Sequence, residues 1–346
     1  MVQEPRVSII LLNWNTWTDT IECLESLSSI SYPEYDVVIV DNGSKDDSVA
    51  RIGRHLGNSG WALKGESAIG EIMVHSYEME IEHGSDGSSA KKMIRRCDVM
   101  LSPINRGFTG GNNIAMRFAM EKLAPDYALL LNNDTEVAAD FLNELMEAME
   151  EHPDCGFASP MILDMAADTI ARRTNIIQYA GAAQSLYLFI PVHRRQSELD
   201  DGREVQPSFT GYAHGTCMLV RAQVIREIGM LDEDFFCYRE ENDWGLRGKR
   251  KGWKALFVPT AKVWHKGGKS SGQVKGMALY YMARNSILIV KKDANPFEKT
   301  VFALSFAAFS FPYRVLKLML LKRDIESTKV FVKGVRDGLK WKGAAP

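Results

Sequence analysis

Short apolar runs alternate with amphipathic stretches along the N-terminal part of the chain. Residues 6–12 form a β-rich apolar run, of the kind that fills a strand buried on both faces of a sheet, and residues 18–30 are amphipathic. Residues 36–40 and 45–56 repeat this order of strand and helix. The alternation predicts a parallel sheet with helices packed on it, and therefore an α/β fold.

A less regular stretch then interrupts the pattern. Residues 57–96 are rich in Gly and Ser, with a β-like segment at 71–81 and a polar, flexible turn at 83–89, and we expect them to elaborate the sheet. The regular pattern resumes with a strand at 99–101, a loop at 105–113, a helix that ends at 123 and a strand at 127–131. Mixed, partly antiparallel β structure is expected at 159–220, followed by helices and a short strand at 255–258.

The last part of the chain is apolar and basic. We expect a helix at 280–292, and then an apolar stretch at 301–321 that Pro312, Arg314 and Lys317 interrupt. Its uninterrupted part, 301–313, is too short to span a bilayer. The pattern predicts either a helix that lies in the interface plane of an anionic membrane or a helical pair that packs on the preceding domain.

Charge sharpens that picture. The formal net charge is −2, but from Lys266 onward 16 Lys and Arg stand against 5 Asp and Glu, a balance of +11 that leaves −13 for the preceding residues. The basic run at 247–254 is short and lies in the acidic part, which argues against nucleic-acid binding. We therefore expect an acidic body with a basic tail.

Composition places the chain among globular proteins of a reducing compartment. It has 346 residues, of which 45% are hydrophobic, enough for a sizeable core. No secretory signal pattern begins at Met1, and the cysteines predict neither a disulfide framework nor a zinc site, because they are odd in number and form no C-x-x-C pair. The cysteines are Cys23, Cys97, Cys155, Cys217 and Cys237.

Candidate chemistry begins directly after the predicted strand at 127–131. Asn132, Asn133 and Asp134 follow it, and ligands of open α/β sheets bind beyond the carboxyl ends of the strands. A strand-end carboxylate suits Mg²⁺ or Mn²⁺, which binds carboxylate and phosphate oxygens together. Such Asn and Asp clusters also form turns that bind nothing, so the triplet alone leaves both interpretations open.

A second candidate is the pair Glu240 and Glu241, with Asp243 close behind. Adjacent carboxylates raise one another's pKa, which can leave one of them ready to accept a proton. The alternative is the solvated, acidic start of a helix. Trp244 either shapes an acceptor site or fills the core.

Two further features have a functional and a structural interpretation. His265 precedes two glycines, where an imidazole can complete a metal site, although single histidines also have structural roles. The glycine-rich stretch at 105–113 allows a nucleotide to approach the backbone, but no G-x-x-x-x-G-K-[ST] motif accompanies it.

Eight segments in order resemble glycosyltransferase family 2, especially its rhamnosyltransferase-like branch, over roughly residues 6–290. They are VSIILLNWN, VVIVDNGSKDDS, NRGFTGGNN, ALLLNNDTEV, HGTCMLVRAQVIREIGMLDEDFF, YREENDWGLRGKRKGW, VWHKGG and YYMARN. The resemblance implies a GT-A fold with a nucleotide-binding half at 1–136, an acceptor-binding half at 137–290 and a basic helical extension at 291–346. It also implies inverting transfer of a sugar from a nucleotide diphosphate, UDP- or dTDP-linked, to an acceptor hydroxyl.

The resemblance also assigns roles to single residues. Asp41 resembles the nucleoside-binding Asp, and the other residues implied at the donor site are Asn13, Asn15, Asn105, Gly111, Asn132, Asn133 and Arg284. Asp134 resembles the last residue of the family's D-x-D metal motif, in which Asn132 replaces the first Asp, and His265 resembles a residue that joins the metal or the diphosphate. Glu241 stands where relatives have the base, with Glu240 as its alternative and Asp243 in support.

The resemblance and the charge together suggest where the protein works. The basic tail suits a lipid-linked acceptor of cell-surface glycan assembly, reached from the cytoplasmic face of the membrane. Two other classes fit the nucleotide pattern. A sugar nucleotidyltransferase should have a Gly- and Arg-rich phosphate loop after the first strand, where this chain has Asn13, Trp14 and Asn15, and a non-catalytic binding module has no need of Glu240, Glu241 or His265.

Overall fold

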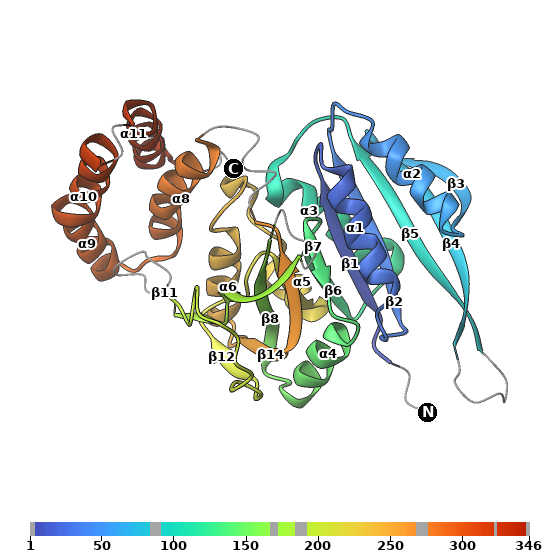
Figure 1. The fold of residues 1–346 in the computed structure, drawn as a ribbon. Coiled ribbons are helices and arrows are strands. Elements are labelled where there is room, and N and C mark those ends of the chain that lie inside the picture. The colour runs from blue at the N-terminus through green and yellow to red at the C-terminus, as the bar shows by residue number, and fades with distance from the viewer. Residues whose placement is uncertain are drawn as a thin grey trace.

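One large sheet runs through the molecule (Figure 1), as seen in a computed structural model that describes residues 4–83, 91–166, 172–183, 192–267, 276–321 and 324–343. Twelve strands of the described residues belong to this sheet. In sheet order they are β12 (Ser208–Thr210), β14 (Lys254–His265), β8 (Cys155–Met165), β13 (Cys217–Arg221), β6 (Tyr127–Asn132), β1 (Val7–Asn13), β2 (Tyr35–Asn42), β5 (Lys91–Ser102), β4 (Ile72–His83) and β3 (Ala62–Ile69), with β7 (Thr135–Val137) beside β14 and β9 (Arg173–Tyr179) beside β8. A separate pair joins β10 (Ala182–Ala183) to β11 (Val192–His193).

The middle of the sheet is parallel. β1 pairs with β2 on one side and with β6 on the other, both in parallel, so the carboxyl ends of all three strands meet at one edge. β13 pairs with β6 and β8 in the antiparallel sense and joins the two halves of the chain into a continuous sheet. The predicted parallel α/β arrangement and the mixed β structure of the second half are therefore confirmed.

Helices cover both faces of the sheet. Alternate strand residues explain this arrangement: Ile9 and Leu11 of β1 point to one core cluster, and Ile10 points to the other. The first cluster includes buried residues of α1 (Trp17–Ser28), α2 (Ser48–Asn58) and α4 (Phe141–Glu151). The second includes residues of α3 (Gly107–Phe118), α5 (Ala222–Ile228) and α6 (Glu240–Arg250). The apolar run of β1 is thus buried on both faces, as predicted.

One predicted boundary differs from the structure, and one predicted turn cannot be compared with it. The expected loop at 105–113 is mostly helix, because α3 begins at Gly107 and continues through a π-helical turn, η1 (Ala119–Leu123). A Cβ added at Gly111 would lie 2.4 Å from Leu12 Cδ1, so the glycine permits close packing of α3 on β1 rather than an open loop. The predicted turn at 83–89 lies largely outside the described residues.

The C-terminal residues form three helices next to α6 (Figure 1). α8 (Met277–Asp293) and α11 (Ile325–Lys340) pack closely, since a Cβ at Gly334 would lie 2.5 Å from Tyr280 O and one at Gly338 would lie 2.7 Å from Arg284 O. Between them lies one helix of 25 residues, Pro296–Leu320, which is long and apolar enough to cross a membrane by length and composition. Its segments are α9 (Pro296–Ser305), η3 (Phe306–Ser310), α10 (Phe311–Leu316) and η4 (Lys317–Leu321).

The prediction that this apolar stretch is too short to span a bilayer is wrong, because it belongs to one continuous helix of 25 residues that includes Pro312. Pro312 lacks an N–H and its ring would clash with the carbonyl one turn earlier in a regular helix. The π-helical turn η3 directly precedes α10, and a π-helical turn changes the hydrogen-bond register, which lets the helix continue.

Candidate functional site

A cavity of about 420 Å³ lies where the carboxyl ends of the parallel strands meet loops of the second half. This volume is in the usual range of ligand pockets. The lining residues from the first half are Leu12, Trp14, Asn42, Asn105, Gly107, Phe108, Asn132, Asn133 and Asp134. Those from the second half are His193, Tyr212, His214, Gly215, Thr216, Phe236, Cys237, Tyr238, Arg239, Glu240, Glu241, His265, Met277 and Met282.

Buried polar contacts hold the loop after β1 against the loop after β2. Asn13 Nδ2 donates to Asp41 Oδ2 at 2.8 Å, and Ser44 N donates to Asp41 Oδ1 at 3.0 Å. Asn15 has φ +53°, and its side-chain oxygen accepts from Lys45 N at 2.7 Å. Asn13, Asn15 and Asp41 are not among the residues that line the described cavity, so their contacts shape the two loops behind Trp14 and Asn42.

Asn42 holds the turn that leads into α3. Its Nδ2 donates to Asn105 Oδ1 at 3.1 Å and to Gly107 O at 3.0 Å, and its Oδ1 accepts from Arg106 N at 2.9 Å. Asn42 and Asn105 both line the cavity. Gly111 does not, because it lies on the side of α3 that packs against Leu12. The sequence pattern gave no role to Asn42, although it directly follows Asp41.

Asp134, in the turn between β6 and β7, meets His265, the last residue of β14, in the cavity. β7 pairs with the end of β14, and His265 Nε2 lies 3.1 Å from Asp134 Oδ1. Burial raises the pKa of Asp134, but the neighbouring His265 and Lys266 outweigh burial, so the net shift is downward and the group is a carboxylate at neutral pH. Both residues are less than a tenth exposed.

The hydrogen bonds of His265 show which ring nitrogen is available. Gln178 Nε2 donates to Asp164 Oδ1 at 2.8 Å, so its oxygen faces His265 Nδ1 at 2.6 Å and Nδ1 carries the hydrogen. In the neutral imidazole, Nε2 then directs a lone pair toward the Asp134 carboxylate, and this contact is favourable only with a proton or a cation present.

These residues fit a divalent cation. Two adjacent ligands of an octahedral Mg²⁺-type site, each at about 2.1 Å, lie about 3 Å apart, which is close to the Asp134 to His265 distance. Mg²⁺ keeps several water or phosphate oxygens, so two protein ligands suffice when a diphosphate supplies others. Within the described ranges no group of three or more His, Cys, Asp or Glu side chains is placed to hold a metal by itself, so a substrate would complete the site.

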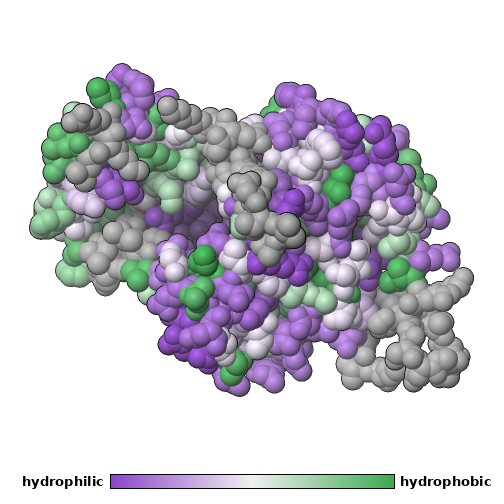
Figure 2. Space-filling model, in the orientation of Figure 1, coloured by the Kyte–Doolittle hydropathy of each residue, from purple (hydrophilic) through white to green (hydrophobic). Residues whose placement is uncertain are grey.

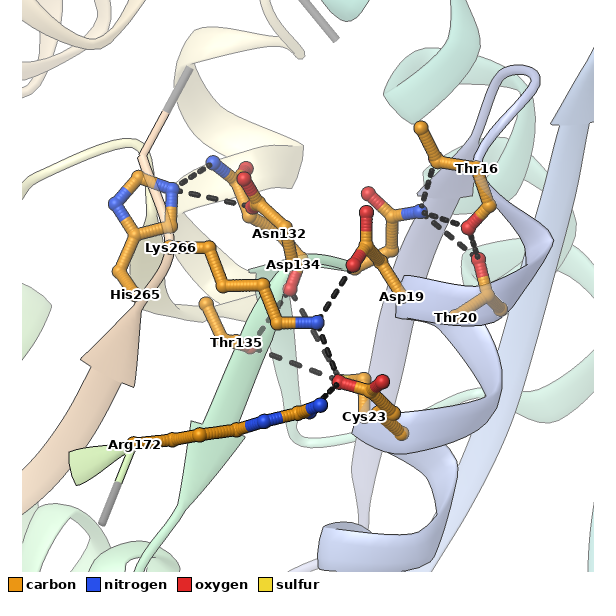
Figure 3. A network of polar contacts seen from close by, with 12 residues as sticks. Thr16, Asp19, Thr20, Cys23, Asn132, Asp134, Thr135, Arg172, His265 and Lys266 are labelled. Carbon is orange, nitrogen blue, oxygen red and sulfur yellow. Dashed lines mark hydrogen bonds and ion pairs between the residues drawn. The ribbon is translucent and has the colours of Figure 1, made fainter. Parts of the chain in front are cut away.

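Contacts with helix α1 hold the segments that carry Asp134 and His265 in place (Figure 3). Lys266 N donates to Asp134 O at 3.0 Å, and its ammonium group binds Asp19 at 2.6 Å and also Glu22. Asn133 Nδ2 donates to Thr20 Oγ1 at 2.8 Å, so it faces α1, while Asn132 Nδ2 lies 3.4 Å from His265 Nε2. The loop after β6 and the end of β14 are therefore anchored to the same helix.

Glu240 and Glu241 begin α6 and also line the cavity. Burial and the neighbouring Glu241 raise the pKa of Glu240 well above its ordinary value, and its Oε2 is buried without a hydrogen-bond partner in the described part of the chain. Burial also raises the pKa of Glu241, which Arg239 partly offsets. The two carboxyls differ in exposure: Glu240 is almost fully buried, and Glu241 is partly exposed.

Asp243 and Trp244 belong to the protein interior. Asp243 Oδ2 accepts from Arg247 Nε at 2.8 Å, and the Arg247 guanidinium also donates to the carbonyls of Ile228 and Met230. Neither Asp243 nor Trp244 lines the described cavity, and Trp244 is fully buried. The core interpretation of Trp244 is confirmed.

The loop before α6 has an unusual backbone. Phe236, Tyr238 and Arg239 have φ values of +62°, +66° and +76°, a region that costs energy for residues with a side chain. Asn285 of α8, which is fully buried, holds this loop: its Nδ2 donates at 2.8 Å to the carbonyls of Phe235, Cys237 and Tyr238. Such strain persists only where the surroundings fix it, and here the loop leads directly to Glu240 and Glu241.

Arg284 lies beside Asn285 but outside the lining of the described cavity. Its guanidinium donates to Asp234 O at 2.8 Å and to Asn285 Oδ1 at 3.1 Å. In this structure the side chain braces the loop at 234–239.

Comparisons with known proteins show the family of this chain. The model of the family described as "Glycosyltransferase like family 2" matches residues 5–278, which is most of the chain. The chain belongs to this family. It is therefore a glycosyltransferase, as the eight segments predicted.

Three relatives of this glycosyltransferase are named as sugar transferases. Agl10 of Haloferax volcanii, a hexosyltransferase of low-salt glycan biosynthesis, is 27% identical over 147 residues, 42% of this chain and 44% of Agl10, so the match spans less than half of that relative. An N-acetylglucosaminyl-diphospho-decaprenol L-rhamnosyltransferase of Mycobacterium tuberculosis is 26% identical over 209 residues, 56% of this chain and 67% of the relative. The dTDP-rhamnosyl transferase RfbF of Shigella flexneri is 22% identical over 68% of this chain and 76% of its own.

Solved structures show the same fold. The mannosyltransferase PcManGT of Pyrobaculum calidifontis, solved with GDP-Man and Mn²⁺, aligns over 99% of this chain and 89% of its own, with a TM-score of 0.53 and 14% identity. A fragment of S. aureus TarS with UDP-GlcNAc aligns over 97% and 81%, with a TM-score of 0.55 and 13% identity. The predicted α/β fold of GT-A type is confirmed.

The glycosyltransferase site also contains an aromatic wall that the sequence pattern did not reveal. His193 and His214 meet edge to face with ring centroids 5.8 Å apart, and His193 Nε2 lies 2.9 Å from Tyr212 Oη. Burial lowers the pKa of His214 to about 3, so its imidazole is neutral. Aromatic faces beside Glu241 suit the packing of a sugar ring. His214 stands in the quoted segment that begins HGTC, but only the structure brings His193 to it.

Replacing Asn285 with Ala should slow this glycosyltransferase by about 10- to 10²-fold in kcat, because small displacements of reacting groups have effects of that size. The loss of its hydrogen bonds to three buried carbonyls should lower the free energy of unfolding by about 1–3 kcal/mol. Donor-induced stabilisation should persist, since Asn285 lies outside the cavity lining. Steady-state kinetics and thermal unfolding measure both effects.

Asn113→Ala is a matched control for that variant. Asn113 is also buried, and its Nδ2 donates at 2.8 Å to Leu231 O, farther from Glu240. It should cost similar stability with a much smaller change in kcat. Equal kcat losses in the two variants would show that Asn285 acts through stability alone.

Proposed function

We propose that this glycosyltransferase moves a sugar, with inversion, from a nucleotide diphosphate donor of UDP or dTDP type to a hydroxyl group of an acceptor glycan. The observation that carries this proposal is one cavity with three kinds of groups around it. Asn42 and Asn105 lie beside the loop of Asp41, the pair of Asp134 and His265 lies at the strand edge, and Glu241 lies on the facing helix. These groups provide for nucleotide, diphosphate and attacking hydroxyl in turn.

In the proposed reaction Glu241 is the base. Its carboxylate takes the proton of the acceptor hydroxyl while that oxygen attacks the anomeric carbon on the face opposite the diphosphate. The new C–O bond forms as the bond to the diphosphate oxygen breaks, and the electron pair leaves with the nucleotide diphosphate. Attack on the opposite face inverts the anomeric carbon. Glu240 is almost fully buried, which favours the more exposed Glu241 as the base.

The leaving diphosphate carries the charge that the site must stabilise. Asp134 and His265 would hold a Mn²⁺ or Mg²⁺ ion, which would neutralise part of this negative charge when bound. Lys266 and Asn133 fix the two residues to α1 through the contacts described above. The Mn²⁺ in the PcManGT structure is consistent with this assignment.

We also propose that the acceptor is a lipid-linked glycan of cell-surface polysaccharide assembly, reached at the cytoplasmic face of the cell membrane. The name of the M. tuberculosis relative specifies a decaprenol-linked acceptor, and the names of two relatives specify rhamnosyl transfer. The long apolar helix Pro296–Leu320 and the basic tail of this chain support the same setting.

Thermal unfolding with a panel of nucleotides tests the proposed function. UDP, dTDP, GDP and CMP, and their sugar derivatives, are added with and without Mn²⁺ or Mg²⁺. A ligand that binds only the folded protein raises Tm, and a concentration 100 times Kd adds about 2.7 kcal/mol. We expect a metal-dependent rise with UDP or dTDP and their sugars. No rise with any nucleotide would favour a non-catalytic module over a transferase.

A further inference from the structure

The helix Pro296–Leu320 exposes an apolar surface that the protein does not cover. Its mean hydropathy is 1.3 over its most apolar window, and only 11% of that window is buried. Figure 2 shows hydrophobic surface gathered over this region, at the left of the view. Three large apolar side chains of this helix are mostly exposed to solvent: Leu304 (68% exposed), Phe309 (74%) and Leu316 (56%). A helix in a protein core would be mostly buried. The exposed apolar face of this helix therefore indicates an interaction with something outside the described fold.

α11 continues the exposed surface with a different pattern. Ile325, Val332 and Leu339 are exposed and stand seven residues apart, which is two helical turns, so they share one face of α11. Lys329 and Arg336 are exposed at the intervening turns of that face. Apolar side chains with cations beside them are typical of helices that lie in a membrane interface.

The packing of the three helices excludes a transmembrane orientation. Gly334 and Gly338 place α11 directly on the backbone of α8, whose Asn285 holds the loop of the active site. If Pro296–Leu320 crossed a bilayer, α11 would begin on the opposite side and would have to return through the membrane to reach α8. α11 carries six charged residues among its 16, so it cannot do so.

The whole helix is long enough to cross a bilayer, but the positions of its charges favour the same conclusion as the packing. Residues 300–313 are the uncharged part of the helix, and 14 residues at 1.5 Å per residue span about 21 Å, compared with a hydrocarbon core of about 30 Å. Arg314 and Lys317 follow at once. This length and flanking charge suit a helix that lies along the surface.

The charges of this surface favour a membrane over a second copy of the chain as the partner that covers it. The exposed charged residues of the three helices are mostly cationic: Lys299, Arg314, Lys329, Lys333, Arg336 and Lys340. A two-fold dimer through this surface would bring like charges together. The head groups of anionic phospholipids, in contrast, complement each of these cations.

We infer that the outward surface of Pro296–Leu320 and α11 docks in the plane of an anionic membrane, with Leu304, Phe309 and Leu316 inserted among the lipids. This inference deepens the proposed function, because it places the lipid end of the acceptor next to the cavity. Met277 and Met282 of α8 line that cavity, and α8 packs on α11. One helix therefore separates the reaction site from the lipid surface.

The test is sedimentation of the full chain with vesicles of phosphatidylglycerol and phosphatidylcholine, and with vesicles of phosphatidylcholine alone. We expect binding to the anionic vesicles that weakens with salt. Leu304→Glu/Phe309→Glu should bind about 10²-fold more weakly, since withdrawing a Leu or Phe from an apolar environment costs roughly tenfold or more per side chain. Leu199→Glu/Phe209→Glu is the matched control, with exposed side chains (65% and 54%) on the catalytic domain, and should bind as the wild type does.

A second variant and an extraction complete the test. Lys329→Glu/Arg336→Glu keeps the apolar side chains and should lose the preference for anionic vesicles. Protein on native membranes should be released by alkaline carbonate, whereas a spanning helix would stay. The inference would be overturned if Leu304→Glu/Phe309→Glu and Lys329→Glu/Arg336→Glu bound the vesicles as strongly as the wild type does. A dimer in solution that Leu304→Glu/Phe309→Glu dissociates would also overturn it. No nucleotide or turnover is needed, so failure of the proposed function would leave this result unaffected.

Discussion

Glu241→Gln should fold and bind the donor but lose at least about 10²-fold in turnover, the usual contribution of a general base. The amide cannot accept the proton of the acceptor hydroxyl, yet it fills the same space at the start of α6. Single-turnover kinetics with saturating donor separates this loss from any change in binding. Donor-induced stabilisation, measured in the same buffer, should match that of the wild type.

Glu240→Gln is the control for this prediction. The Glu240 carboxyl is almost fully buried and is not the proposed base, so the neutral amide should reduce turnover far less than Glu241→Gln does. The pH profile gives a second check. Because burial raises the pKa of Glu241, the base is lost as the pH falls, and kcat should decline below a pKa higher than the ordinary value of about 4.3. The opposite order of the two variants would assign the base to Glu240.

Asp134→Asn should abolish the metal dependence of donor binding and reduce kcat/KM by about 10²-fold or more, since a metal contributes several kcal/mol to charge stabilisation. The substitution removes the carboxylate and leaves His265 as the remaining protein ligand of the proposed pair. Thermal unfolding with a nucleoside diphosphate, with and without Mn²⁺, measures the metal dependence. Kinetics at a series of Mn²⁺ concentrations measures the loss of activity.

Asp200→Asn is a matched control for the charge change. Asp200 is also a buried carboxylate with one basic partner, Lys262 Nζ at 2.6 Å, and it does not line the cavity. It should leave the Mn²⁺ dependence intact. If Asp134→Asn kept a normal response to Mn²⁺, the metal would lie elsewhere and the role assigned to His265 would fall with it.

Much of the fold could be predicted from the chain because burial imposes clear patterns. The apolar runs of β1, β2 and β6 are buried on both faces, and such strands leave continuous apolar segments in the sequence. The start of α3 was harder to predict. Gly107, Gly110 and Gly111 are poor helix formers, and their helix is stabilised by close packing on Leu12, which no local pattern shows.

The candidate site was predicted only in part, for a similar reason. Residues at or just after the end of a strand, such as Asn132 and Asp134, can be predicted from their position in the sequence. The structure places them around one cavity with Glu241 and His265. The contacts of Asn285 and His193 depend on pairings across 47 to 50 residues and 19 residues, which only the folded chain brings together. The strained backbone at Tyr238 and Arg239 has no glycine to signal it.

The length of the tail helix was harder to predict. Pro312 lies inside a continuous helix because the π-helical turn η3 precedes it. Asn295 and Glu298 form a capping box at the start of this helix, with Pro296 in its first turn.

The glycines of α11 have a consequence for the proposed docking on a membrane. Gly334 and Gly338 stand four residues apart, and their backbones touch the carbonyls of Tyr280 and Arg284. Contact of this kind relies on dispersion forces between backbones, and expulsion of water contributes little to it. Its strength therefore changes little when the surrounding medium changes from water to lipid head groups. In the proposed membrane docking, the helices would adsorb to a bilayer and leave it again as a preassembled unit, without a refolding step at each encounter.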